Sequence, residues 1–226
     1  MGDVVFVQAL ALGLDPAWRR LPEERQLEDG AAFVGLLEAP ATEVETVLYS
    51  TVGIEPGIDV LVWRRAVSVA ELEEANARLL RTGLGRSLSV RHAFLGKTGP
   101  SQYARRPSSE ASSAFESPTA RYLVIYPFTK STEWYLLGRE ARQGIMNEHM
   151  RIGHEYPAVR QLLTYSFGLD DQDFVVMYET DDLSAFGELV RALRATEGRR
   201  STVNDQPIVV GVRRSAAEFV RLLIAS

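Results

Sequence analysis

The chain contains no cysteine and few histidines. Without cysteine there can be no disulfide, no cysteine-ligated zinc, no iron–sulfur cluster and no thiol nucleophile. Only three histidines are present, His92, His149 and His154. Any metal must therefore be bound through one of these imidazoles or through carboxylates.

The chain also lacks an excess of positive charge and a long apolar run. Its 25 Lys and Arg and 30 Asp and Glu leave a net charge of −5, which argues against a nucleic-acid partner. No run of about 18 apolar residues is present, so no membrane span is expected. The N-terminal segment is apolar, but Asp3 stands where a signal peptide carries positive charge. We therefore expect a first strand there, and a cytoplasmic protein.

The sequence does contain an internal repeat. Trp18 and Trp134 are 116 positions apart, and Leu21 and Leu137 have the same separation. Residues 70–82 then match residues 183–196 at a slightly shorter offset. Two copies of one module are the simplest explanation of such a repeat.

Each copy is predicted to run strand, helix, β-hairpin, helix, strand, with the last strands at residues 88–96 and 206–212. This order is typical of the ferredoxin-like fold. The predicted fold class is therefore α+β, with two tandem ferredoxin-like modules that pack into one pseudo-symmetric, β-barrel-like domain. We place the modules at residues 1–98 and 121–226, joined by a connector rich in Ser, Pro and Ala at 99–120.

The two copies differ in polarity at corresponding positions. His149 corresponds to Phe33, while Lys130 and Tyr126 each replace a leucine of the first copy. Polar and ligating groups thus occur in the second copy where the first is apolar. This asymmetry predicts a cofactor in the C-terminal module only.

His149 interrupts the apolar stripe of a predicted helix. Ala141, Ile145 and Ile152 fall on the same stripe, so the imidazole should point inward. His154 lies about 140° around the helix, so the two histidines cannot share one metal. A lone inward histidine can be an ordinary core residue, and other polar groups must decide between the two interpretations.

Three further polar side chains are predicted to face the same cavity. Alternation in the strand 122–130 places Tyr126 and Lys130 on one face. In the strand 159–167, Gln161 is the polar residue on the more apolar face. An iron porphyrin would suit this set, because it offers an apolar ring, a metal for the imidazole and propionates for the lysine.

Four segments carry a resemblance to a known family. YPFTKSTEWYLL (126–137), NEHMRIGH (147–154), YSFGLDDQDF (165–174) and LVRALRATE (189–197) resemble the chlorite dismutase family of haem proteins, which includes the coproheme decarboxylases. The resemblance is close in the second module and reaches the first only through the fold. It implies a ring assembly, commonly a homopentamer.

The resemblance also implies roles for individual residues. His149 would be the proximal iron ligand, and the carboxylate of Glu197 would accept the other imidazole N–H. Lys130 would bind a propionate, and Trp134 would line the cavity.

The resemblance separates two reactions at the opposite side of the ring. Chlorite dismutases keep a distal arginine where this chain has Gln161, a residue that many coproheme decarboxylases carry. Those decarboxylases also keep a tyrosine in a YP pair, which Tyr126 and Pro127 match, and the tyrosine relays a radical to a propionate that loses carbon dioxide. One departure is the absence of an Arg-x-Arg element before this strand, where only Arg105 and Arg106 occur further upstream.

The predicted function is therefore that of a coproheme decarboxylase that uses hydrogen peroxide and produces haem b. The cofactor would be haem b or iron coproporphyrin III, one per chain. Two alternatives stay open: chlorite dismutase or weak haem peroxidase activity on the same scaffold, and a haem-binding or cofactor-less protein that is not an enzyme.

Overall fold

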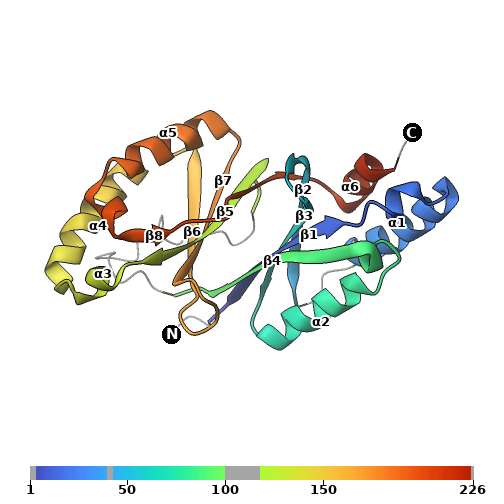
Figure 1. Cartoon of the computed structure of the whole chain (residues 1–226), viewed down its shortest axis with the longest axis horizontal. Helices are drawn as coiled ribbons and strands as arrows, with labels where there is room; N and C mark the ends of the chain where they lie inside the picture. Colours follow the sequence, from blue (N-terminus) through green and yellow to red (C-terminus); the bar gives the residue numbers. More distant parts are fainter. Residues whose placement is uncertain (1–3, 40–42, 100–117, 225–226) are drawn as a thin grey trace. The chain divides into compact units, whose positions relative to one another are not determined.

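The structure is a computed structural model that describes residues 4–39, 43–99 and 118–224 (Figure 1). The chain divides into two compact units. The first comprises the described residues up to Lys97 together with those from Val210 onward, and the second spans Thr98–Val209. Each unit is described by itself.

The first unit has antiparallel strands in the order β4-β1-β3-β2. This is the strand order of the ferredoxin-like fold. Its strands are β1 (Phe6–Leu14), β2 (Glu45–Glu55), β3 (Ile58–Ala66) and β4 (Leu88–Lys97). Its helices up to Lys97 are η1 (Trp18–Arg20), α1 (Glu23–Leu37), α2 (Val69–Leu80) and η2 (Leu84–Ser87).

The second unit repeats this arrangement with strands in the order β8-β5-β7-β6. Its strands are β5 (Tyr122–Lys130), β6 (Val159–Tyr165), β7 (Phe174–Thr180) and β8 (Thr202–Asn204). Its helices are α3 (Thr132–Leu136), α4 (Arg139–His154), α5 (Leu183–Arg194) and η4 (Glu197–Ser201). The predicted α+β class with two ferredoxin-like modules is confirmed.

Local sequence explains why the elements begin and turn at corresponding places in both units. Ser68 and Glu71 form a capping box at the start of α2, and the Asp182 side chain caps α5 by accepting two backbone N–H bonds. In the β6–β7 turn, Gly168 has a φ of 72°, which residues with a side chain rarely adopt.

The C-terminal segment departs from the expected module boundary. Residues 206–212 were expected to be the last strand of the second module, but β8 takes that place beside β5. The following strand β9 (Val209–Arg213) pairs antiparallel with β2 of the first unit instead. Helix α6 (Ala216–Leu223) then packs on α1, with the rings of Phe33 and Phe219 6.1 Å apart. The first unit therefore gains its last strand and helix from the far end of the chain.

Two expectations concern other parts of the chain. Most of the predicted connector 99–120, including Arg105 and Arg106, lies outside the described residues. Among the helices that the structure describes, none is long and apolar enough to cross a membrane.

Candidate functional site

One face of the second unit's strands carries the polar side chains that the sequence singled out. Tyr126 and Lys130 lie on the same face of β5, since their positions differ by an even number. Tyr178 on β7 lies directly opposite both Val124 and Gln161, so it shares this face. The Tyr178 ring contacts Phe186 of α5, with centroids 5.2 Å apart. The face is therefore the one that the helices cover.

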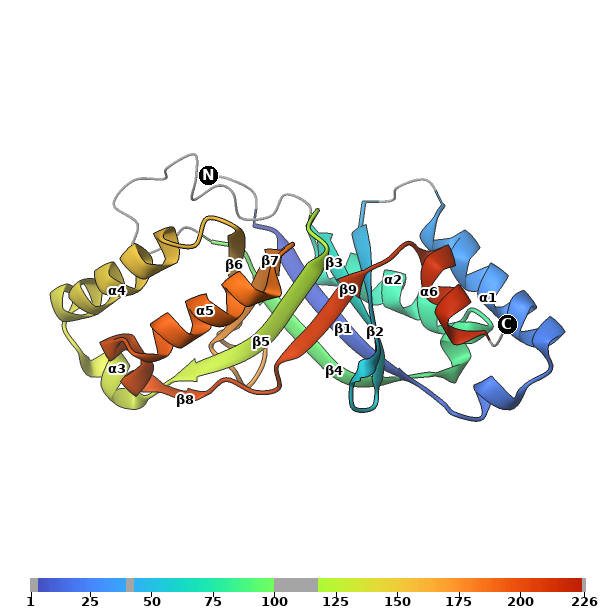
Figure 2. The same cartoon turned by 90° about the horizontal axis from the view of Figure 1, so that it is seen from above.

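Helix α4 supplies His149 to this side of the unit and lies alongside α5 (Figure 2). The imidazole is half-buried, and no hydrogen bond to it is found in the part of the chain that the structure describes. Burial lowers the pKa of His149, the nearby Lys130 charge lowers it further, and Glu148 opposes both. These effects favour a neutral imidazole with nitrogens open to a metal.

The other two histidines behave differently. His154 is exposed at the end of α4. His92 lies on β4 in the first unit and stacks on Phe94, with ring centroids 5.8 Å apart. No group of three or more His, Asp or Glu side chains that could hold a metal ion occurs among the described residues.

Lys130 brings a cation into the same region. Its Nζ donates to the backbone oxygen of Gly198 at 2.8 Å and to Thr202 Oγ1 at 3.0 Å. The same nitrogen lies 4.8 Å from the ring centroid of the buried Trp134. Burial, and then the charge of Arg199, lower the pKa of Lys130 to about 8. Its partners here are neutral, so an added carboxylate would relieve the cost of burying this charge.

Tyr126 stacks on a second tyrosine, Tyr178. The Tyr126 and Tyr178 rings lie 6.0 Å apart at an interplanar angle of 26°. Burial raises the pKa of Tyr126, and a hydrogen bond with Tyr178 acts in the opposite direction. Tyr126 is thus a protonated phenol at neutral pH, able to donate its hydrogen.

Glu197 and Gln161, which were also predicted to belong to the site, make none of the contacts described above. The Glu197 side chain is exposed and pairs with Arg200 at 3.3 Å, and within the described ranges no hydrogen bond joins it to His149. Its backbone N–H donates instead to Glu148 Oε2 at 3.4 Å. Gln161 is on the expected face but is exposed. The roles predicted for these two residues stay predictions.

No sequence pattern singled out Tyr178. It lies in the run FVVMYET, which is buried throughout β7, so no alternation of polar and apolar residues marks one face. The partner of Tyr126 could be found only from the register of β5 against β7.

In the described part of the second unit, the side chains of the two long helices are only partly buried. None of the 16 residues of α4 is fully buried, although Ile145 and Ile152 lie on its apolar stripe. In α5 only Leu189 is buried. Apolar side chains that remain partly uncovered around an open imidazole suit an apolar ring with a metal centre. The residues present therefore fit an iron porphyrin.

The first unit shows that the four site positions converge in this fold. Leu10, Leu14, Trp18 and Phe33 belong to one buried apolar cluster. Their counterparts 116 positions further along the chain are Tyr126, Lys130, Trp134 and His149. Strands β1 and β5 and helices α1 and α4 keep this offset, so equivalent positions occupy equivalent places within each unit. The repeat thus supports one shared site for the four polar or aromatic residues.

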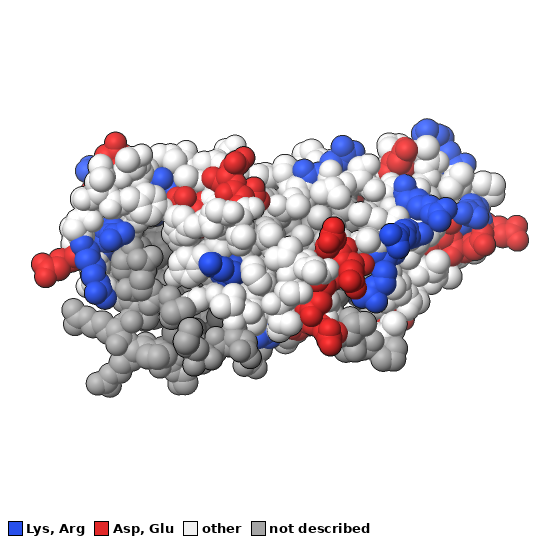
Figure 3. Space-filling model, turned by 90° about the horizontal axis from the view of Figure 1, so that it is seen from below, with Lys and Arg blue, Asp and Glu red and all other residues white. Residues whose placement is uncertain are grey.

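The surface charge is mixed on the face of the molecule that Figure 3 presents. Blue basic patches adjoin red acidic ones there, and neither sign forms a broad field. Nucleic-acid binding needs an extended basic surface, and this face does not offer one.

Comparisons with known proteins identify the relatives of this chain. The family model described as chlorite dismutase matches residues 25–214. A coproheme decarboxylase from Mycolicibacterium smegmatis is 29% identical over 198 residues, covering 87% of this chain and 84% of that protein.

Solved structures of chlorite dismutases superpose on nearly the whole chain. A mutant chlorite dismutase from Candidatus Nitrospira defluvii superposes with a TM-score of 0.89 at 26% identity, covering 97% of this chain and 95% of its own. The chlorite dismutase of the same organism in complex with imidazole gives a TM-score of 0.88 at 27% identity, covering 97% and 94%.

Proposed function

Because the chain belongs to the chlorite dismutase family, we propose that it binds an iron porphyrin and acts as a coproheme decarboxylase. In this reaction hydrogen peroxide would oxidise two of the four propionates of iron coproporphyrin III to vinyl groups, with release of carbon dioxide and reduction of the peroxide to water, to give haem b. The coproheme decarboxylase relative supports the choice of reaction. The observation that carries the proposal is the half-buried imidazole of His149, which has no hydrogen bond within the described residues and lies on a helix of which no residue is fully buried.

Each side chain has a part in holding the group. His149 would ligate the iron, Lys130 would bind a propionate, and Trp134 would contact the edge of the ring beside Lys130. When bound, the iron porphyrin supplies the redox chemistry with peroxide. The protein supplies position, charge and protons around it.

Tyr126 would serve the oxidation of the propionate. Its phenol is neutral at physiological pH and can lose a hydrogen atom to become a radical. A protonated, half-buried tyrosine on the face that also carries Lys130 is suitably placed to act on a carboxylate held there.

Gln161 favours decarboxylation over chlorite chemistry. An uncharged amide cannot hold an anionic oxidant as an arginine would, whereas hydrogen peroxide is neutral and needs no such charge. Dismutation of chlorite is the alternative, and the structural similarity to chlorite dismutases is what favours it. The predicted pentameric ring and cytoplasmic location stay predictions.

The test is to mix purified apoprotein with iron coproporphyrin III and then with peroxide. We expect an absorption spectrum of a histidine-ligated iron porphyrin, followed by the loss of one carbon dioxide and two hydrogens in mass for each propionate that becomes a vinyl group. Bound coproporphyrin that stays intact would overturn the proposed reaction. Sustained oxygen release from chlorite would establish the alternative.

A further inference from the structure

Tyr178 places a hydroxyl group in the most deeply buried strand of the second unit. All seven residues of β7 are buried, and Tyr178 is 3% exposed. A phenylalanine would fill nearly the same volume without a polar atom. A hydroxyl in such a strand needs a hydrogen-bond partner, because leaving it unpaired costs free energy.

The register of the strands puts this hydroxyl beside Tyr126. Tyr178 is opposite Val124 on β5, and Tyr126 is the next residue along β5 on the same face. The two rings stack at 6.0 Å. On its other side the Tyr178 ring rests against Phe186 of α5. Tyr178 is thus held between the strand that carries Tyr126 and a helix.

The direction of the hydrogen bond follows from the burial of the two hydroxyl groups. Tyr178 is 3% exposed and forms a side-chain hydrogen bond with Tyr126, whereas Tyr126 is only half-buried. A buried O–H needs an acceptor within the protein, while a half-buried one can turn toward solvent or a ligand. The Tyr178 O–H is therefore assigned as the donor and the Tyr126 oxygen as the acceptor.

We propose that Tyr178 is a positioning residue that orients the hydroxyl of Tyr126. By donating to one side of the Tyr126 oxygen, Tyr178 leaves the Tyr126 O–H to point away from β7. A phenol hydroxyl otherwise rotates to suit its surroundings, so one firm donor selects its direction. In this orientation the Tyr126 O–H would face a bound propionate, a role that rests on the proposed function.

The charged groups around Tyr126 set the background for a test. Asp205 raises the pKa of Tyr126, while Arg194 and Arg199 lower it. These side chains remain in a Tyr178→Phe variant, which removes one oxygen and keeps the ring contacts. A change in the Tyr126 pKa in that variant would thus report the lost hydrogen bond.

The first experiment uses apoprotein with carbon-13 in the tyrosine ring and follows each phenol by NMR against pH. The Tyr126 signal is assigned with Tyr126→Phe. We expect Tyr178→Phe to raise the Tyr126 pKa, because the phenolate loses its donor. Tyr122→Phe, on the same strand, should leave it unchanged. An unaltered Tyr126 pKa in Tyr178→Phe would overturn the inference, and thermal unfolding would verify that the variant is folded.

The second experiment separates this inference from the proposed reaction. With coproheme and peroxide, Tyr178→Phe should lower kcat about threefold to tenfold with KM unchanged, as expected for one hydrogen bond. Tyr49→Phe removes the hydroxyl of a buried tyrosine in the first unit and should keep kcat. If wild-type protein fails to decarboxylate coproheme while the Tyr126 pKa still shifts, the reaction is wrong and the positioning role stands. If the wild type is active and kcat is unaffected in Tyr178→Phe, the orientation has no catalytic use.

Discussion

The two units differ in how well their first long helix is buried: α1 packs into an apolar core, whereas α4 is only partly buried. In the first unit Phe33 is fully buried in an apolar cluster that also contains Phe219 and Val220 of α6. Gly30 allows this close approach, since an added Cβ would lie 2.5 Å from a Val220 methyl group. In the second unit His149 takes the place of Phe33, and no residue of α4 is fully buried. The same fold thus makes a sealed core in one copy and, in the other, a partly buried face at which we propose that the porphyrin binds.

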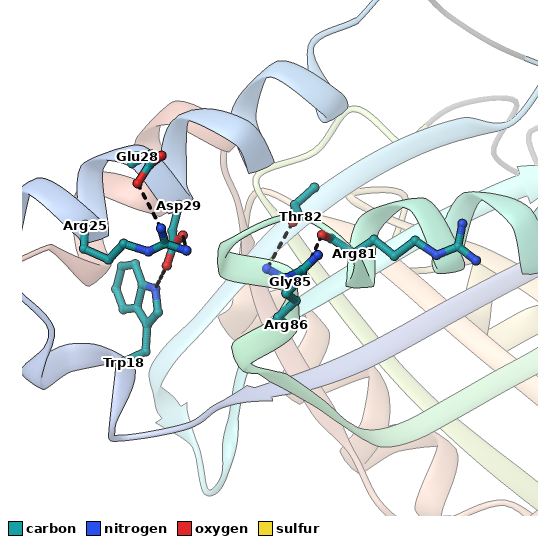
Figure 4. Close-up of polar contacts among 8 residues, drawn as sticks. All are labelled: Trp18, Arg25, Glu28, Asp29, Arg81, Thr82, Gly85 and Arg86. Carbon is teal, nitrogen blue, oxygen red and sulfur yellow. Dashed lines mark hydrogen bonds and ion pairs between the residues drawn. The ribbon is translucent and has the colours of Figure 1, made fainter.

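Polar groups follow the same division. Beside Phe33, Asp29 is buried and accepts a bond from Trp18 Nε1 at 3.1 Å while pairing with Arg25 at 3.0 Å (Figure 4). This acid has its partners within the protein. In the second unit Lys130 is partly buried with only neutral acceptors, and His149 has no hydrogen bond within the described part of the chain. A buried charge that is paired within the protein stabilises the fold, whereas a cation with only neutral acceptors can still gain from an added carboxylate.

The largest expected effect comes from making the second unit resemble the first at its key position. His149→Phe introduces the residue found at position 33, and we expect it to abolish iron ligation. Absorption spectra with added haem b and with added iron coproporphyrin III measure this. His154→Phe is the matched control and should bind as wild type. A spectrum of His149→Phe identical to wild type would refute the assignment of the ligand.

Truncating Phe219, the α6 side chain that packs beside Phe33, should lower the stability of the protein and leave the proposed site intact. Phe219→Ala deletes a ring that is 0% exposed, so we expect a loss of about 3–5 kcal/mol in the free energy of unfolding. Urea unfolding of the apoprotein measures it. Leu222→Ala, at an exposed position of the same helix, should cost far less. Equal losses in the two variants would show that α6 is not part of this core.

The buried acid of the first unit allows a smaller and more selective test. Asp29→Asn should destabilise the protein by about 1–3 kcal/mol, because it weakens both the hydrogen bond from Trp18 and the ion pair with Arg25 at a buried side chain. Glu28→Gln removes an exposed partner of the same Arg25 and should change stability by less than about 1 kcal/mol. Thermal or urea unfolding of both variants distinguishes a structural acid from a surface one.

Lys130 should give the smallest effect, and one that depends on pH. Its pKa of about 8 means that the ammonium charge is lost as the pH rises through that value, while the unfolded chain keeps its proton to higher pH. Apoprotein stability should therefore rise slightly above pH 8, whereas affinity for a porphyrin carboxylate should fall. Lys130→Met should weaken coproheme binding about tenfold at pH 7, as for a charge-assisted bond, with Lys97→Met as control. Binding that is independent of pH in wild type would contradict a charge contact with propionate.

The sequence predicted much of the fold and part of the site. The repeat, the helix caps and the alternation in β5 are local patterns, so the order of elements and the shared face of Tyr126 and Lys130 could be read directly. The Glu197 carboxylate was expected at the imidazole on resemblance alone, and in the structure it is exposed and paired with Arg200. The direction of a side chain at a loop after a helix depends on neighbours distant in sequence, which no periodicity reports.

By itself the sequence determined that this is a duplicated α+β protein whose second copy carries a histidine where the first carries phenylalanine. Side-chain chemistry and local periodicity suffice for that. Only the tertiary structure decided that residues from Val210 onward complete the first unit and that Tyr178 pairs with Tyr126. Both depend on strand register between segments far apart in the chain. Register is selected by the total burial of many side chains, and no single motif encodes it.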